Sequence, residues 1–87
     1  MIVELNTPGG NTFSGSADGV EMRTTDGAIT LRPGEESYLN LTHATQVVLR
    51  IGTEFVTFEI ENAAASFRDG RLTILAETIR RVEPAAG

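Results

Sequence analysis

Polar and apolar residues alternate with a period of two along most of this chain. Val20 and Met22, for example, alternate with Glu21 and Arg23. Successive side chains of a β-strand point to opposite faces, so this pattern predicts half-buried strands with one packed face and one solvated face. The alternation occurs in five segments: residues 20–23, 29–32, 39–42, 47–51 and 56–61.

Turn-forming residues separate the alternating segments. They recur roughly every eight to twelve residues, a spacing typical of all-β sandwiches and barrels. No window of helical length carries an apolar stripe. We therefore expect an all-β fold, a small two-sheet sandwich of about nine to ten short strands without substantial helix. It would occupy residues 1–83, with a flexible tail at 84–87. The turn signals are Pro8-Gly9-Gly10-Asn11, Asp26-Gly27, Arg32-Pro33-Gly34-Glu35, Gly52-Thr53-Glu54 and Asp69-Gly70.

The last turn signal belongs to a closing hairpin. Residues 67–78 predict two strands folded about Asp69-Gly70, because this dipeptide tolerates the positive φ angles of a tight hairpin turn. Only nine residues follow this hairpin in the chain of 87 residues.

Composition narrows the possible partners. The formal net charge is −5, and the seven basic residues, all arginine, are scattered along the sequence. Such a chain lacks the basic stripe that tracks phosphates, so nucleic acid and acidic lipid headgroups are disfavoured. There are no cysteines, which leaves packing alone to hold the domain together. No targeting signal or membrane-spanning run is visible, and we expect a peripheral protein without lipid insertion.

The sequence predicts no catalytic site, metal site or cofactor. The single histidine, His43, is expected to be an exposed strand-end or loop residue, since a functional histidine needs an orienting partner. Glu59 and Glu61 share one face of a strand, as paired catalytic carboxylates would. A solvated outer face explains them as well, because Thr57 continues the same polar row. We keep a small hydrolase as a remote alternative.

Several apolar residues occupy positions that alternation assigns to the outer face. They can mark a surface where another subunit packs, or they can be isolated exposed residues and strand irregularities. These residues are Val48, Phe55, Leu75 and Tyr38.

Four blocks of sequence, in order, resemble the N-terminal β-sandwich domain of the epsilon subunit of F-type ATP synthases, called delta in mitochondria. The blocks span nearly the whole chain. The family likewise opens with a strand, a Thr-Pro turn and a Phe-Ser-Gly, and closes with a similar hairpin. The blocks are Val3-Glu4-Leu5 with Thr7-Pro8 and Phe13-Ser14-Gly15, then residues 26–34, the hairpin 47–60, and residues 69–78.

The resemblance implies a non-catalytic subunit of the central stalk, or rotor. It would link the gamma subunit to the ring of c subunits, coupling proton or sodium transport to ATP synthesis on the cytoplasmic side of the membrane. The family's ring-facing loop matches Thr25, Asp26, Gly27 and Ala28. The turn near which gamma binds matches Glu35, Glu36, Ser37 and Tyr38.

The resemblance also implies two helices after the sandwich, which in the family restrain ATP hydrolysis and in some members bind ATP. Here the sequence stops at Gly87. We therefore expect coupling without helix-mediated inhibition and without nucleotide binding, unless the natural protein continues past this residue. The alternative function is a free-standing β-sandwich adaptor or regulatory protein derived from this domain, suggested by Glu35-Glu36-Ser37 where the family has His-Ala-Pro.

Overall fold

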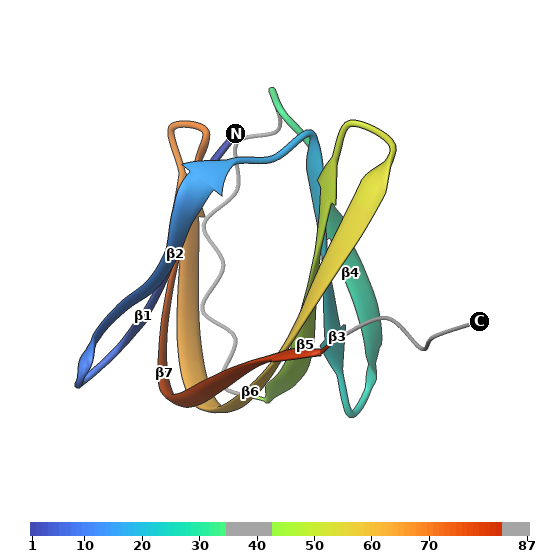
Figure 1. Ribbon diagram of the computed structural model, residues 1–87. Coiled ribbons are helices and arrows are strands. Elements are labelled where there is room, and N and C mark those ends of the chain that lie inside the picture. Colours follow the sequence, from blue (N-terminus) through green and yellow to red (C-terminus); the bar gives the residue numbers. More distant parts are fainter. Residues whose placement is uncertain (35–42, 83–87) are drawn as a thin grey trace.

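The computed structural model describes residues 1–34 and 43–82, which form strands joined by short turns (Figure 1). The strands pair in the order β2-β1-β7-β6-β5-β3-β4. Neighbours are antiparallel except β1 and β7, which run parallel. The strands are β1 (Ile2–Thr7), β2 (Gly10–Ser16), β3 (Gly19–Thr24), β4 (Gly27–Leu31), β5 (Ala44–Ile51), β6 (Glu54–Arg68) and β7 (Arg71–Val82).

The sheet folds back on itself into two packed layers. β1, β2 and parts of β6 and β7 form one layer, and β3, β4, β5 and the first part of β6 form the other. β6 and β7 are the longest strands, and both bend from one layer into the other at the bottom of Figure 1. The chain is therefore an all-β sandwich without a helix in the described residues, as predicted.

The corner of the sandwich lies at Asn62. This residue has a φ of 51°, a left-handed conformation that asparagine tolerates better than most side chains. Its amide Nδ2 donates a hydrogen bond of 2.8 Å to the Glu77 carboxylate on β7. The inward-facing parity of β6 changes here, from Ile60 on one side to Ala63 on the other. A single residue thus lets one strand serve both layers.

The described residues contain seven strands, fewer than the nine to ten expected. The alternating run at 56–61 and the strand ending near Phe67 belong to one strand, because β6 turns the corner without losing its pairing to β7. Apolar runs that pass a corner resemble two separate strands in the sequence. The run at 39–42 lies outside the described residues.

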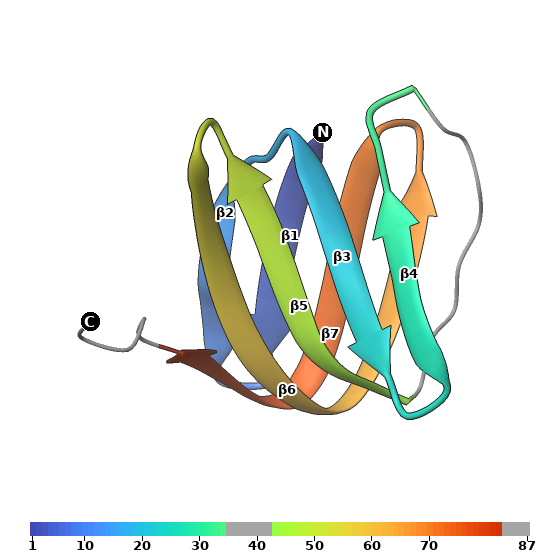
Figure 2. The ribbon, with the colours of Figure 1, turned by 90° about the vertical axis from the view of Figure 1, so that its right-hand side faces the viewer.

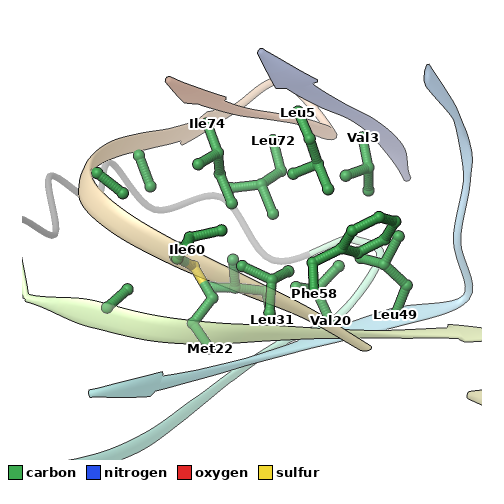
Figure 3. Packing of buried hydrophobic residues seen from close by; sticks show 14 of the residues in the cluster. Val3, Leu5, Val20, Met22, Leu31, Leu49, Phe58, Ile60, Leu72 and Ile74 are labelled. Carbon is green, nitrogen blue, oxygen red and sulfur yellow. The ribbon is translucent and has the colours of Figure 1, made fainter. Parts of the chain in front are cut away.

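The core fills the space between the layers (Figure 3). The rings of Phe13 on β2 and Phe58 on β6 lie 5.7 Å apart and are tilted by 56°. This distance is within the range of favourable aromatic pairs. No polar side chain is buried within the described ranges. The largest fully buried side chains are Phe67, Leu5, Met22, Leu31, Leu49, Leu72, Ile74, Val3, Val20 and Val47.

The turns gather at two opposite ends of the sandwich. The β1–β2 and β3–β4 turns lie at the end where β6 and β7 bend, and the β5–β6 and β6–β7 turns lie at the other end (Figures 1 and 2). The closing hairpin is confirmed: β6 ends at Arg68 and β7 begins at Arg71. Asp69 and Gly70 between them have φ angles of 54° and 70°, as a two-residue primed turn requires.

Candidate partner-binding surfaces

The loop Thr25-Asp26-Gly27-Ala28 forms the tip of the β3–β4 hairpin, and all four residues are exposed. The Thr24 hydroxyl closes the turn from below. Its Oγ1 accepts a hydrogen bond of 3.1 Å from the Asp26 backbone N–H and donates one of 2.9 Å to the Gly27 carbonyl. These two bonds link Thr24 to the backbone of the turn, and the exposed Asp26 side chain lies at its tip.

The β1–β2 hairpin is closed in the same way, by Thr7. The Gly9 backbone N–H donates a hydrogen bond of 3.2 Å to the Thr7 hydroxyl. The same hydroxyl donates one of 3.4 Å to the Gly10 carbonyl. Neither threonine was predicted from the sequence to have a role in a turn. The available signal was a threonine three residues before a glycine at Thr7 and Thr24, since short hydroxyl side chains often bond to nearby turn backbone.

A shallow hollow of about 260 Å³ connects the Thr25 loop to the corner of the sandwich. Thr25, His43, Glu61 and Asn62 are among its lining residues. His43 is exposed and directly precedes β5, as expected for a strand-end residue. The loop and the corner therefore form one continuous surface at this end of the molecule.

The second predicted contact segment, Glu35, Glu36, Ser37 and Tyr38, lies outside the described residues. Its assignment to gamma binding stays a prediction. The segment follows β4, whose last residue, Leu31, is buried in the core.

Glu59 and Glu61 lie on the outer face of β6, near the corner. The Glu59 carboxylate accepts a hydrogen bond of 2.5 Å from Arg80, its direct pairing partner on β7. This hydrogen bond and the negative charge of Glu59 raise the pKa of Arg80 above its ordinary value. Glu59 is thus engaged in an ion pair on an exposed surface and is not the free carboxylate that a catalytic pair requires. The geometry gives the hydrolase alternative no support.

The outer face of β4, β3, β5 and the first part of β6 carries a groove of about 270 Å³. We call it the arginine groove, and its lining includes Arg32, Arg50, Phe55, Val48, Gly19 and Glu21. Val48 faces outward, yet only 8% of its surface is exposed, whereas Phe55 is 67% exposed. Both outward positions were predicted from alternation, and the structure brings them together.

The outer face of β2, β1, β7 and the last part of β6 differs in its chemistry. We call it the paired face. Arg71 on β7 forms an ion pair of 2.6 Å with Glu4 on β1. Leu75, which is 54% exposed, lies opposite Ala64 in the β6–β7 ladder. Leu75 thus faces outward as predicted, but on the opposite layer from Phe55.

The described residues hold neither a group of three or more metal-ligating side chains nor a helix of the length and apolar character that would traverse a bilayer.

The family model of the ATP synthase delta/epsilon chain β-sandwich domain matches residues 1–82. The chain belongs to this family. The delta/epsilon match covers every strand from β1 to β7, so the resemblance noted in the sequence is confirmed. A search of curated proteins returns no match.

Solved structures show the same fold in two ATP synthases studied by cryo-EM. A chain in the OSCP/F1/c-ring structure of the Euglena gracilis mitochondrial enzyme superposes with a TM-score of 0.81 at 16% sequence identity. A chain in the central stalk/c-ring structure of the Tetrahymena thermophila mitochondrial enzyme gives 0.67, also at 16% identity. The alignments cover 93% and 91% of this delta/epsilon domain, but 52% and 64% of those chains.

Proposed function

We propose that this protein is a central-stalk subunit of an F-type ATP synthase, which links the gamma subunit to the c ring and carries out no chemical step itself. It would act at the membrane surface on the cytoplasmic side, as a peripheral part of the complex. The observation that carries the proposal is the delta/epsilon family match over residues 1–82, which spans the whole sandwich.

The architecture suits a mechanical coupling element. The core contains no polar side chain within the described ranges, and the layers share two continuous strands, β6 and β7. A load applied to one layer is therefore transmitted through covalent strands as well as through packing. Rigid transmission is what a rotor component requires.

The Thr25–Ala28 loop is the proposed c-ring contact. It projects from one end of the sandwich, and the Thr24 hydroxyl holds it in place. Asp26 gives the tip a negative charge that would attract basic loops of a ring. The proposed gamma contact is Glu35, Glu36, Ser37 and Tyr38.

A pull-down with purified gamma subunit and c ring tests this assignment. The variant Asp26→Asn should weaken retention by the c ring by about two- to fivefold, as expected for loss of one exposed charge pair. It should leave retention by gamma unchanged. Asp69→Asn is the matched control, because it removes the same charge from an exposed turn at the opposite end of the sandwich. Equal effects of the two variants would contradict the loop assignment.

The role itself is tested by adding the protein to a matching synthase that lacks its epsilon subunit. Coupled proton pumping should be restored. A chain retained by neither gamma nor the ring, with no change in coupling, would instead be a free-standing adaptor.

A further inference from the structure

The arginine groove holds two guanidinium groups that form no ion pair with a carboxylate of the described residues. Four of the seven arginines form ion pairs with nearby acidic residues, and Arg81 is engaged as well. Within the described ranges, Arg32 and Arg50 have no ion pair or side-chain hydrogen bond. Both line the same groove. The chain as a whole is acidic, with a net charge of −5, so two neighbouring arginines without an ion pair among the described residues distinguish this groove.

Two acidic residues beside the groove, Asp18 and Glu21, have other partners. The Asp18 carboxylate accepts a hydrogen bond of 2.7 Å from the Gly52 backbone N–H, across the start of the β5–β6 turn. Glu21 contacts Arg23 at 3.4 Å. Among the described residues, neither of these two carboxylates pairs with Arg32 or Arg50.

The backbone positions Arg50 against the sheet. Gly19 pairs with Arg50 across β3 and β5. A methyl group placed on Gly19 would lie 3.7 Å from Nε of Arg50 and 3.8 Å from one of its terminal nitrogens. The guanidinium thus lies directly over a residue without a side chain. Partial ordering in this way lowers the entropy that binding must remove.

Beside the guanidinium groups lies an apolar surface. Val48 forms a floor, and the exposed ring of Phe55 stands at the start of β6. Arginine recognises carboxylates through paired N–H donors, and an exposed aromatic ring beside arginines is typical of protein-binding hot spots. The volume of about 270 Å³ is below the range of about 300–1,000 Å³ that small-molecule sites occupy. It suits a few side chains of a peptide.

We propose that the arginine groove binds a short segment of a partner protein that carries both carboxylates and apolar side chains. The carboxylates would pair with Arg32 and Arg50, and the apolar side chains would cover Val48 and Phe55. A nucleic acid could also offer anions, but the net charge of −5 repels a long polyanion.

The groove and the Thr25–Ala28 loop can be occupied at the same time. Gly19 begins β3 and Thr24 ends it, so the two sites are separated by roughly 17 Å along the strand. This step rests on the proposed function, in which one molecule holds two partners at once. The groove would then be a second docking point, at the end of the sandwich away from the ring-facing loop.

Nuclear magnetic resonance titration of the full chain with a synthetic peptide tests the proposal. The probe is Gly-Leu-Asp-Phe-Asp-Gly, compared with Gly-Leu-Asn-Phe-Asn-Gly. The aspartate peptide should bind about tenfold more tightly, as two charge-assisted pairs would provide. Its addition should shift the backbone amide signals of Gly19, Val48 and Phe55 but not that of Leu75.

Two variants and their matched controls locate the effect. Arg32→Gln with Arg50→Gln should abolish the preference for aspartate, whereas Arg68→Gln, at an exposed hairpin position, should keep it. Phe55→Ser should lower the affinity for both peptides, whereas Leu75→Ser should leave both affinities unchanged. All five substituted positions are exposed, so folding should persist, and circular dichroism checks this.

Three results would overturn the proposal: equal affinity for the two peptides, unchanged binding by the arginine double variant, or equally tight binding of oligothymidylate. Concentration-dependent dimerisation that is lost in the arginine double variant would instead identify a second copy of the chain as the occupant. The titration contains no synthase component. A negative titration would therefore contradict only the groove proposal, and a negative pull-down would contradict only the proposed central-stalk role.

Discussion

The two outer faces of the sandwich are both built from β-strands, but they differ in how their arginines are paired. On the paired face, Arg71 is neutralised by Glu4, and the corner amide of Asn62 is bonded to Glu77. In the arginine groove, two guanidinium groups have no partner within the described residues, and Phe55 is open to solvent. Satisfied polar groups stabilise a fold without attracting a ligand. An exposed guanidinium without an acidic neighbour is bonded to water, which the carboxylate of a partner can replace.

Both outer faces are supported by the same core. A core substitution should therefore destabilise the whole sandwich, whereas the same substitution in the arginine groove should not. Phe67 is fully buried, and Phe67→Ala should lower the free energy of unfolding by about 3–5 kcal/mol. Phe55→Ala, the same change at an exposed position, should alter it by less than about 0.5 kcal/mol. Urea denaturation followed by circular dichroism measures both. A similar loss for the two variants would mean that Phe55 is a structural residue.

The corner connects the two layers, and its backbone conformation should matter next. Asn62→Val places a β-branched side chain at a φ of 51° and should cost about 1–2 kcal/mol. Asn62→Gly keeps the conformation accessible and loses only the hydrogen bond to Glu77. Thermal denaturation should therefore rank wild type above glycine and glycine above valine. Valine as stable as glycine would show that backbone strain at the corner is negligible.

The smallest effect should come from the charges themselves. A double-mutant cycle on Glu4 and Arg71 should give a coupling energy of about 0.2–1 kcal/mol, which decreases as salt screens the pair. Arg50→Gln should leave stability within about 0.5 kcal/mol of the wild type, because Arg50 has no ion pair to lose among the described residues. Equal destabilisation by Arg71→Gln and Arg50→Gln would remove the distinction between the faces.

Alternation in the sequence predicted the outward positions of Phe55 and Leu75 correctly, and the Asp69-Gly70 turn was predicted at the right residues. Alternation could not predict that Phe55 shares one groove with two arginines that are far apart in the sequence. Arg32 follows β4 and Arg50 lies on β5, and these strands are joined only through β3. Their proximity depends on the order of strands in the sheet, which a period-two pattern does not contain.

The strand count shows the same limit. Alternation reports which face a residue occupies locally, and it restarts when the inward parity changes at Asn62. The sequence therefore indicated two strands where the structure has one.

The amino-acid sequence alone determined the all-β class, the positions of the turns, the absence of a catalytic motif and the resemblance to the delta/epsilon family. Each of these properties can be read from short stretches of sequence taken in order, so no knowledge of strand neighbours is needed. Only the tertiary structure decided the corner at Asn62, the separation of Phe55 from Leu75 onto opposite layers, and the gathering of Arg32 and Arg50 in one groove. Each of these depends on which strands lie side by side, and packing of the shared core sets that arrangement.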